Sequence, residues 1–235
     1  MSVVSVVGAR PVFTTDNGQL TTDIFTMYRV KVKICGIRTL EEASAALEYG
    51  ADALGFNFWP GSPRHVSPES AGAIISRLHP FAASIGVFVN ETPDTVLSLF
   101  HRLGLSAVQL HGDETPEYCN GLAGVRIIKA LRVGLGFDPK SIKAYPANAI
   151  LLDASLKGHY GGTGRRFDWS AAIESKEYAP IILAGGLTVE NVEEAVKTVQ
   201  PMAVDVCSGV EAEPGKKDLG KLKLFMATVR RVAEA

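Results

Sequence analysis

The sequence of 235 residues lacks several features that would assign it to a specialised class of protein. No apolar run approaches the roughly 20 residues of a membrane-spanning helix, so we predict a soluble protein without a membrane partner. The formal net charge is -1, which gives no general attraction to nucleic acid. The glycine-rich P-loop motif of nucleotide-binding proteins is also missing.

Cysteine is scarce as well, with only Cys35, Cys119 and Cys207 in the chain. Their number is odd and their spacing matches neither a disulfide framework nor a metal site. Disulfides persist mainly in oxidising compartments, so we expect reduced thiols in a cytoplasmic protein that holds no metal.

The sequence does contain a repeated alternation of short apolar runs with helical periodicity. Most of the runs are apolar without strict alternation, which is typical of strands buried on both faces of a parallel sheet. We expect eight strands: Val30–Cys35, Ala51–Phe58, Ala83–Val89, Ala107–Leu110, Arg126–Leu131, Ala149–Asp153, Pro180–Ala184 and Met202–Val206. Eight βα units favour a single-domain α/β fold, a closed (β/α)8 TIM barrel, over an open doubly wound sheet.

Helix starts between these runs have recognisable signals. Thr39 followed by Glu42 has capping-box spacing, which predicts a helix that begins at residue 40. Ser67, Thr92 and Thr115 each precede a proline, and this pairing places a capping residue directly before the first helical turn. The alternation of strands and helices therefore has support at both kinds of element.

Residues 1–26 fit no element of this repeat. Their apolar start lacks a preceding basic flank, and Asp16 and Asp23 follow, which is unlike a secretory or transit signal. We interpret residues 1–26 as an extension, either disordered or the product of an upstream start site, and residues 27–235 as the barrel domain.

The carboxyl ends of barrel strands form the active site in this fold, and polar residues and glycines gather at those positions here. The candidates are Cys35, Arg64, His111, Asp153, the pair Gly185–Gly186 and the pair Ser208–Gly209. The two glycine turns follow the last two strands, where barrels often hold a phosphate on backbone N–H groups. Tight βα turns would use the same residues, and this alternative remains open.

The individual side chains also allow two readings each. Cys35 is either a reactive thiol or a small buried hydrophobic residue, and Asp153 is either an acid with a pKa raised by burial or a structural hydrogen-bond acceptor. Arg64 suits a carboxylate or phosphate but could be solvated, and His111 could orient a ligand. The glycine-rich segment 156–166 is interpreted as a lid, with a plain connector as the alternative.

Several of these residues lie in motifs that resemble one family. The motifs are Lys33-Ile34-Cys35-Gly36-Ile37-Arg38-Thr39, Gln109-Leu110-His111-Gly112, Leu152-Asp153-Ala154, Gly161-Gly162-Thr163-Gly164, Phe167-Asp168-Trp169, Leu183-Ala184-Gly185-Gly186-Leu187 and Ser208-Gly209-Val210-Glu211. Together they resemble phosphoribosylanthranilate isomerase, a (β/α)8 barrel of tryptophan biosynthesis. Cys207 departs from the family, which commonly has serine there.

The resemblance implies an isomerase that carries out an Amadori rearrangement of N-(5-phosphoribosyl)anthranilate, without cofactor or metal. It implies that Asp153 is the general acid, Cys35 the general base and Arg64 the carboxylate-binding residue, with the glycine turns holding the phosphate. A free thiol with a pKa of about 8.5 is mostly protonated at neutral pH, so we expect Lys33 or Arg38 to supply a positive charge.

Two rivals remain at this point. One is another phosphosugar barrel enzyme with a different base on the first strand, and the other is a non-catalytic phosphate-binding barrel. A pure binder needs neither Cys35 nor Asp153. The expected partner is a small phosphosugar substrate, and the chain is expected to be a monomer or a homodimer.

Overall fold

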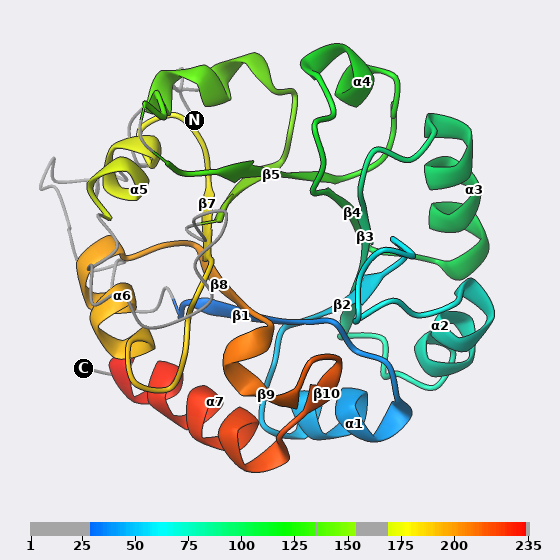
Figure 1. Ribbon diagram of the computed structural model, residues 1–235, viewed down its shortest axis with the longest axis vertical. Coiled ribbons are helices and arrows are strands. Elements are labelled where there is room, and N and C mark those ends of the chain that lie inside the picture. Colours follow the sequence, from blue (N-terminus) through cyan, green and yellow to red (C-terminus); the bar gives the residue numbers. More distant parts are fainter. Residues whose placement is uncertain (1–28, 135, 154–168, 234–235) are drawn as a thin grey trace, which may run out of the picture.

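Eight parallel strands close into a barrel in the computed structural model, which describes residues 29–134, 136–153 and 169–233. Each strand pairs with the next along the chain, and β8 pairs with β1 to complete the ring (Figure 1). The strands are β1 (Lys31–Cys35), β2 (Ala53–Asn57), β3 (Ala83–Phe88), β4 (Ala107–Leu110), β5 (Ile127–Arg132), β6 (Ala149–Asp153), β7 (Ile181–Ala184) and β8 (Ala203–Val206). The (β/α)8 prediction is confirmed, and each strand bound lies within two residues of its expected position.

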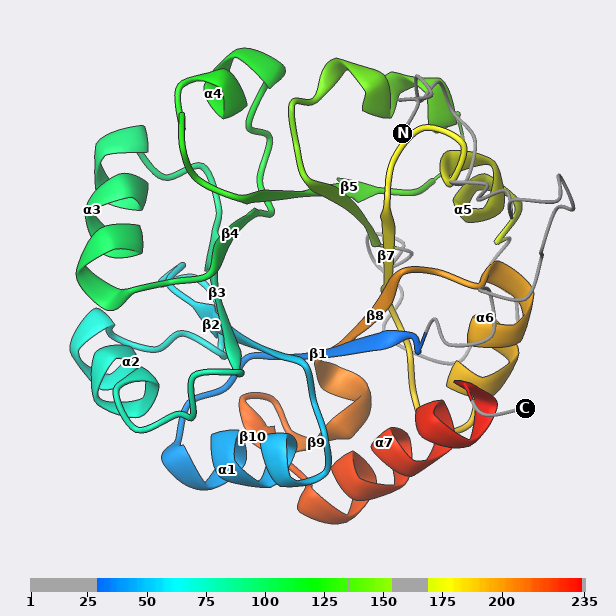
Figure 2. The same cartoon turned by 180° about the vertical axis from the view of Figure 1, so that it is seen from behind.

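Helices surround the barrel as an outer ring, with one helical segment after each strand (Figures 1 and 2). They are α1 (Leu40–Glu48), α2 (Pro68–Ile75), α3 (Pro93–Leu103), α4 (Pro116–Asn120), the 3-10 helix η2 (Pro139–Ala144), α5 (Ser170–Ser175), α6 (Val192–Val199) and α7 (Leu219–Ala233). α7 lies between α1 and α6 and so closes the ring where the chain ends.

The predicted helix starts are present where the sequence placed them. The Thr39 hydroxyl accepts from the N–H of Glu42 while the Glu42 carboxylate accepts from Thr39, which completes the capping box. Ser67, Thr92 and Thr115 each accept a hydrogen bond from the third residue beyond. These caps satisfy backbone donors that would otherwise be unpaired at the start of each helix.

The connection from β8 to α7 holds elements that the repeat did not predict. A short 3-10 helix, η3 (Ser208–Val210), leads into an antiparallel ribbon of β9 (Glu211–Glu213) and β10 (Lys216–Lys217). The ribbon lies beside β1 and α1 in Figure 1. It carries two charged side chains, Glu211 and Lys217, that are buried at the barrel rim.

Two hydrophobic clusters stabilise the fold. The larger one lies between the strands and the helices and includes Phe56, Phe88 and Phe225, all nearly inaccessible to solvent. The smaller one lies inside the barrel and is built mainly from alanine with Leu151 and Ile182. Small residues leave space inside the barrel for polar side chains from neighbouring strands.

Two predicted segments lie outside the described residues. These are the extension of residues 1–26 and the lid of residues 156–166. Among the described residues, no helix combines the length and apolar character needed to cross a membrane.

Candidate active site

A buried ion pair lies beneath the first candidate residue. Lys33 on β1 and Asp205 on β8 are register partners, and the Lys33 Nζ atom lies 2.8 Å from Asp205 Oδ1. Burial alone would lower the pKa of Lys33, but the negative charges of Asp205 and Cys35 hold it above its ordinary value. Burial raises the pKa of Asp205 to about 6, although the Lys33 charge opposes that rise. Lys33 therefore remains a cation inside the barrel.

Cys35 ends β1 two residues beyond Lys33 and is 8% exposed. A hydrogen bond from the Cys207 thiol lowers the pKa of the Cys35 thiol well below its ordinary value, against the opposing effect of burial. The positive charges of Lys33 and Lys217 act in the same direction. The expected positive influence thus comes from Lys33 and from Lys217, whereas Arg38 instead donates to the Gly215 carbonyl oxygen at 3.3 Å.

Cys207 follows β8 and is the hydrogen-bonding partner of Cys35. This contact, burial and the nearby charges of Cys35 and Glu211 raise the pKa of the Cys207 thiol well above its ordinary value. Its sulfur lies 3.7 Å from Glu211 Oε1 and 3.8 Å from Lys217 Nζ. Because Cys207 has one proton, it donates either to Glu211 or to Cys35 at a given moment. The opposite shifts favour the thiolate on Cys35 and the thiol on Cys207.

Arg64 lies in the loop after β2, and its guanidinium is fixed by Glu211. Its Nε and Nη2 atoms donate to the two carboxylate oxygens of Glu211 at 3.1 and 2.7 Å, a bidentate contact. Lys217 Nζ lies 3.2 Å from Glu211 Oε1. Burial would raise the pKa of Glu211, but the hydrogen bond from Arg64 and the charge of Lys217 keep it below its ordinary value. The three side chains together carry one net positive charge.

His111 and Asp153 form the opposite part of the rim. The His111 Nε2 atom lies 3.4 Å from Asp153 Oδ2, and its Nδ1 atom lies 2.7 Å from Gln109 Nε2. With the amide in this orientation, Gln109 donates to Nδ1 and the histidine proton is on Nε2, directed at Asp153. The Asp153 side chain is 19% exposed and that of His111 28%. His111, which follows β4, therefore contacts the side chain at the end of β6.

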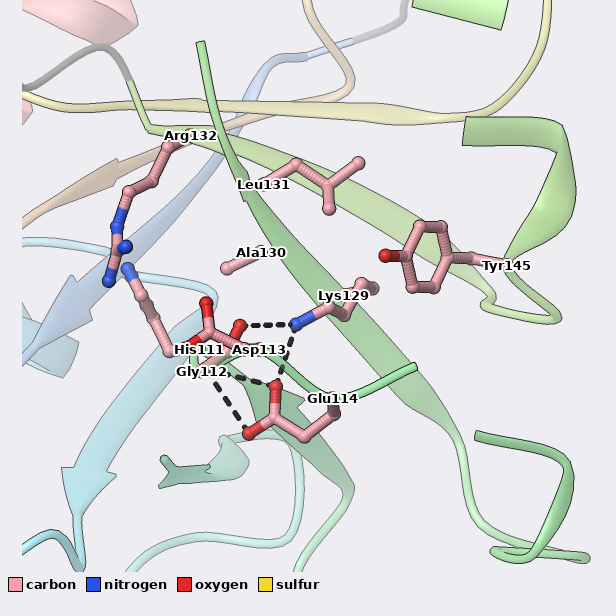
Figure 3. A pocket seen from close by; sticks show the side chains of 9 residues that line it. All are labelled: His111, Gly112, Asp113, Glu114, Lys129, Ala130, Leu131, Arg132 and Tyr145. Atoms are coloured by element: carbon pink, nitrogen blue, oxygen red, sulfur yellow. Dashed lines mark hydrogen bonds and ion pairs between the residues drawn. The ribbon is translucent and has the colours of Figure 1, made fainter. Parts of the chain in front are cut away.

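A pocket of about 270 Å³ opens beside His111 between the ends of β4 and β5 (Figure 3). Its wall includes Arg132 and Tyr145, and one side is held by a buried ion pair between Lys129 and Glu114 at 2.7 Å. Both carboxylate oxygens of Glu114 accept from the N–H of Gly112, as Figure 3 shows. This pair fixes the loop that carries His111.

The two glycine turns after β7 and β8 lie against each other. Gly185 and Gly186 have φ angles of +84° and +67°, which favour glycine. A Cβ atom on Gly209 would overlap the backbone of Leu187, so only glycine permits this approach. Within the described residues, the backbone N–H groups of Gly186, Ser208 and Gly209 meet no acceptor. The turns therefore present adjacent unpaired donors at the rim.

The structure thus brings every candidate named from the sequence to one rim, and it adds residues that sequence reasoning missed. Asp205, Lys217 and Gln109 were assigned no role, and Glu211 only completed a motif. A charged residue inside an apolar strand run, such as Asp205, was a usable signal, because such a charge is rarely buried without a partner. Within residues 29–134, 136–153 and 169–233, no group of three or more potential ligands is arranged to hold a metal ion.

Comparison with known proteins identifies the family. The model for N-(5'phosphoribosyl)anthranilate (PRA) isomerase matches residues 32–228. The N-(5'-phosphoribosyl)anthranilate isomerase of Geobacter sulfurreducens is 52% identical over 199 residues, which cover 84% of this chain and 97% of the relative.

Solved structures indicate the same family. Phosphoribosyl anthranilate isomerase from Thermotoga maritima superposes with a TM-score of 0.80 at 45% identity, covering 86% of this chain and 99% of that one. A structure of such an isomerase in complex with reduced 1-(o-carboxyphenylamino)-1-deoxyribulose 5-phosphate superposes with a TM-score of 0.77 at 43% identity, again covering 86% of this chain and 99% of that one. This chain belongs to the N-(5'-phosphoribosyl)anthranilate isomerase family.

Proposed function

We infer that the chain catalyses the Amadori rearrangement of N-(5'-phosphoribosyl)anthranilate to 1-(2-carboxyphenylamino)-1-deoxyribulose 5-phosphate, a step of tryptophan biosynthesis. Family membership supports the reaction. The observation that carries the mechanism is that Cys35 and Asp153 each end a strand of one parallel barrel and so lie at the same rim. The lowered pKa of Cys35 and the contact of Asp153 with His111 support it. The reaction relocates protons and gains or loses no electrons overall, so acid and base groups suffice for it.

The first step opens the sugar ring. Asp153, in its protonated form, donates a proton to the furanose ring oxygen, the bond from that oxygen to C1 breaks, and the anthranilate nitrogen becomes an iminium. The position of Asp153 at the end of β6 places its carboxyl group at the rim, 3.4 Å from a histidine that can orient it. This placement supports the general acid role that we propose for Asp153.

The second step removes a proton from C2 of the opened sugar. A proton beside an iminium carbon is acidic, and the electron pair that it leaves forms an enolamine. Cys35 takes this proton as a thiolate, the form that its hydrogen bond from Cys207 and the charges of Lys33 and Lys217 favour. The enolamine then tautomerises to the aminoketose product.

The two ends of the substrate are anionic, and the rim offers a donor set for each. The Arg64 guanidinium retains donors on Nη1 that meet no acceptor within the described residues, and we assign these donors to the anthranilate carboxylate. The backbone N–H groups of Gly185, Gly186, Ser208 and Gly209 are assigned to the phosphate. Holding both ends fixes the reacting carbons between Cys35 and Asp153.

The test follows the loss of phosphoribosylanthranilate fluorescence with purified protein. Cys35→Ala and Asp153→Asn should each lower kcat by about 10²–10⁴-fold, the usual contribution of a general acid or base. Cys119→Ala and Asp94→Asn are the matched controls, since Cys119 lies in α4 and Asp94 is exposed in α3 on the outer ring, and they should retain activity. Full activity in both site variants would refute the assigned roles, and an inactive wild-type protein would favour another phosphosugar reaction.

We place this activity in the cytoplasm, because a catalytic thiolate depends on a reducing environment. The chain is proposed to act on its small phosphosugar as a monomer or homodimer. Sedimentation analysis of the purified protein distinguishes the two states.

A further inference from the structure

We propose that Cys35 and Cys207 form an oxidation-sensitive dithiol that closes as a reversible intramolecular disulfide and thereby disables the enzyme. The two sulfurs come from neighbouring strands and contact each other in the reduced protein. The proposal rests on the proposed function only where it concerns activity, because formation of the disulfide is measurable on its own.

The strand register places the two cysteines side by side. Lys33 pairs with Asp205 and Ile34 with Val206, and Cys35 and Cys207 each follow by one residue. Neighbouring strands lie about 4.7–4.9 Å apart, and disulfides usually join Cα atoms about 4.4–6.8 Å apart. The strand spacing at Ile34 and Val206, the residues just before the two cysteines, therefore lies in the range that suits a disulfide.

The direction of the side chains agrees with this spacing. Successive residues of a strand point to opposite faces, so Cys35 shares a face with Lys33, whose side chain meets Asp205. Cys207 lies two residues beyond Asp205, and its thiol reaches Cys35. Its sulfur is also within van der Waals reach of a Cβ atom placed on Gly36, the residue after Cys35. The two thiols therefore lie beside each other at the rim.

The charges around the pair assign a different role to each sulfur. Cys35 faces Lys33 and Lys217, and it is the sulfur that attacks the oxidant as a thiolate. Cys207 is the resolving thiol, with Glu211 Oε1 at 3.7 Å to accept its proton and Lys217 Nζ at 3.8 Å to stabilise the sulfur anion. Cys207 is partly exposed, which gives a small oxidant access to the pair.

Hydrogen peroxide serves as the oxidant in a balanced sequence. The Cys35 thiolate attacks one peroxide oxygen, the O–O bond breaks, and a sulfenic acid and hydroxide form. The Cys207 sulfur, after transfer of its proton, attacks the sulfenic sulfur, and the S–O bond breaks to release the second oxygen. The net change converts two thiols and one peroxide into one disulfide and two waters.

The disulfide removes both the proposed base and its hydrogen-bond donor. It also protects Cys35 from further oxidation to the sulfinic acid, which thiol reductants do not reverse. The third cysteine, Cys119, lies buried in α4 and is not part of the pair. Cys119 therefore serves as an internal control for the selectivity of the oxidation.

The experiment treats the folded full-length wild-type protein with hydrogen peroxide, blocks remaining thiols by alkylation, and maps tryptic peptides by mass spectrometry without reduction. We expect the Cys35 and Cys207 peptides to be joined, with a mass lower by two hydrogens, while Cys119 is alkylated. Activity should fall by about 10²–10⁴-fold in fully joined protein and return with dithiothreitol.

Two variants and three contrary results complete the test. After peroxide treatment, Cys119→Ala should give the same joined peptides as the wild type. Cys207→Ser should lose activity on the same treatment, and dithiothreitol should not restore it. Each variant is compared with its own untreated protein. Oxidised Cys35 with free Cys207 in the wild type, or a bond to Cys119 or to a second chain, would overturn the proposal. Joined peptides with full activity would overturn the proposed loss of activity on oxidation and would refute the catalytic role of Cys35, although the disulfide itself would be shown.

Discussion

The base half of the rim, around β1 and β8, differs sharply from the acid half around β4 and β6. Cys35 is 8% exposed and lies near buried cationic and anionic groups that include Lys33, Asp205 and Lys217. Asp153 and His111 are more open, at 19% and 28% side-chain exposure, and His111 borders a pocket. The base half thus places buried charges directly beside a buried candidate residue, whereas the candidate residue of the acid half is partly exposed.

This difference matches what each reacting group has to do. A thiol is a useful base only when it is ionised, and its ordinary pKa of about 8.5 leaves it mostly protonated at neutral pH. Charge and a hydrogen-bond donor are therefore gathered around Cys35. The proposed acid, Asp153, has to reach a bulky substrate that must enter and leave, and its partly exposed side chain suits that role. The predictions below test this division.

The largest effect is expected from Lys33→Met, which removes the cation beneath Cys35. Asp205 is left buried without its partner, so the free energy of unfolding should fall by about 3–5 kcal/mol in urea denaturation. The pKa of Cys35 should rise, measured by the pH dependence of its alkylation. Lys129→Met, in the ion pair of the acid half, should destabilise the fold similarly without moving the Cys35 titration. Equal shifts of the Cys35 titration in Lys33→Met and Lys129→Met would contradict the proposed difference between the two halves of the rim.

Glu211→Gln should have the next largest effect. Arg64 loses its bidentate partner, and the guanidinium is no longer held in one orientation at the rim. We expect KM to rise about tenfold with a smaller change in kcat, because a contact of this strength corresponds to about 1.4 kcal/mol. Glu213→Gln, in the exposed part of the same ribbon, is the control. An unchanged KM in Glu211→Gln would show that Arg64 needs no such support.

Cys207→Ala should shift the pH profile of the base half. The Cys207 hydrogen bond lowers the pKa of Cys35, so its loss raises that pKa and reduces the thiolate fraction at neutral pH. The acidic limb of kcat/KM, which reports deprotonation of the base, should move up by about one pH unit. Cys207→Ser keeps a donor and should move it less. Identical profiles for the alanine and serine variants would rule out the hydrogen bond as the cause.

His111→Asn should produce the smallest effect and should act mainly on the acid half. It removes the partner that orients Asp153, and a single hydrogen bond of this kind corresponds to a loss of about three- to tenfold in kcat. The Cys35 alkylation profile should move less than in Cys207→Ala, because Cys207 hydrogen-bonds to the Cys35 thiol whereas His111 contacts Asp153. A larger shift than in Cys207→Ala would place His111 in the base half.

The sequence predicted the barrel and its strands well, because buried parallel strands and capped helix starts are local patterns. It also brought Cys35 and Asp153 to one rim through the repeat alone. It could not predict the ionisation of Cys35, since Lys33, Cys207 and Lys217 are brought around the thiol by strand register and by the β9–β10 ribbon. The Arg64 contact with Glu211 spans 147 positions in the chain, and no local pattern reports such a pairing.

The central claim is that Cys35 is a thiolate at neutral pH while Cys207 remains a thiol. The most direct test measures the rate of iodoacetamide alkylation at each cysteine of the native protein between mildly acidic and alkaline pH, with peptide mass spectrometry to separate the sites. The account predicts a Cys35 midpoint well below the ordinary value of about 8.5 and a Cys207 midpoint above it. A Cys35 midpoint at or above the ordinary value would contradict it.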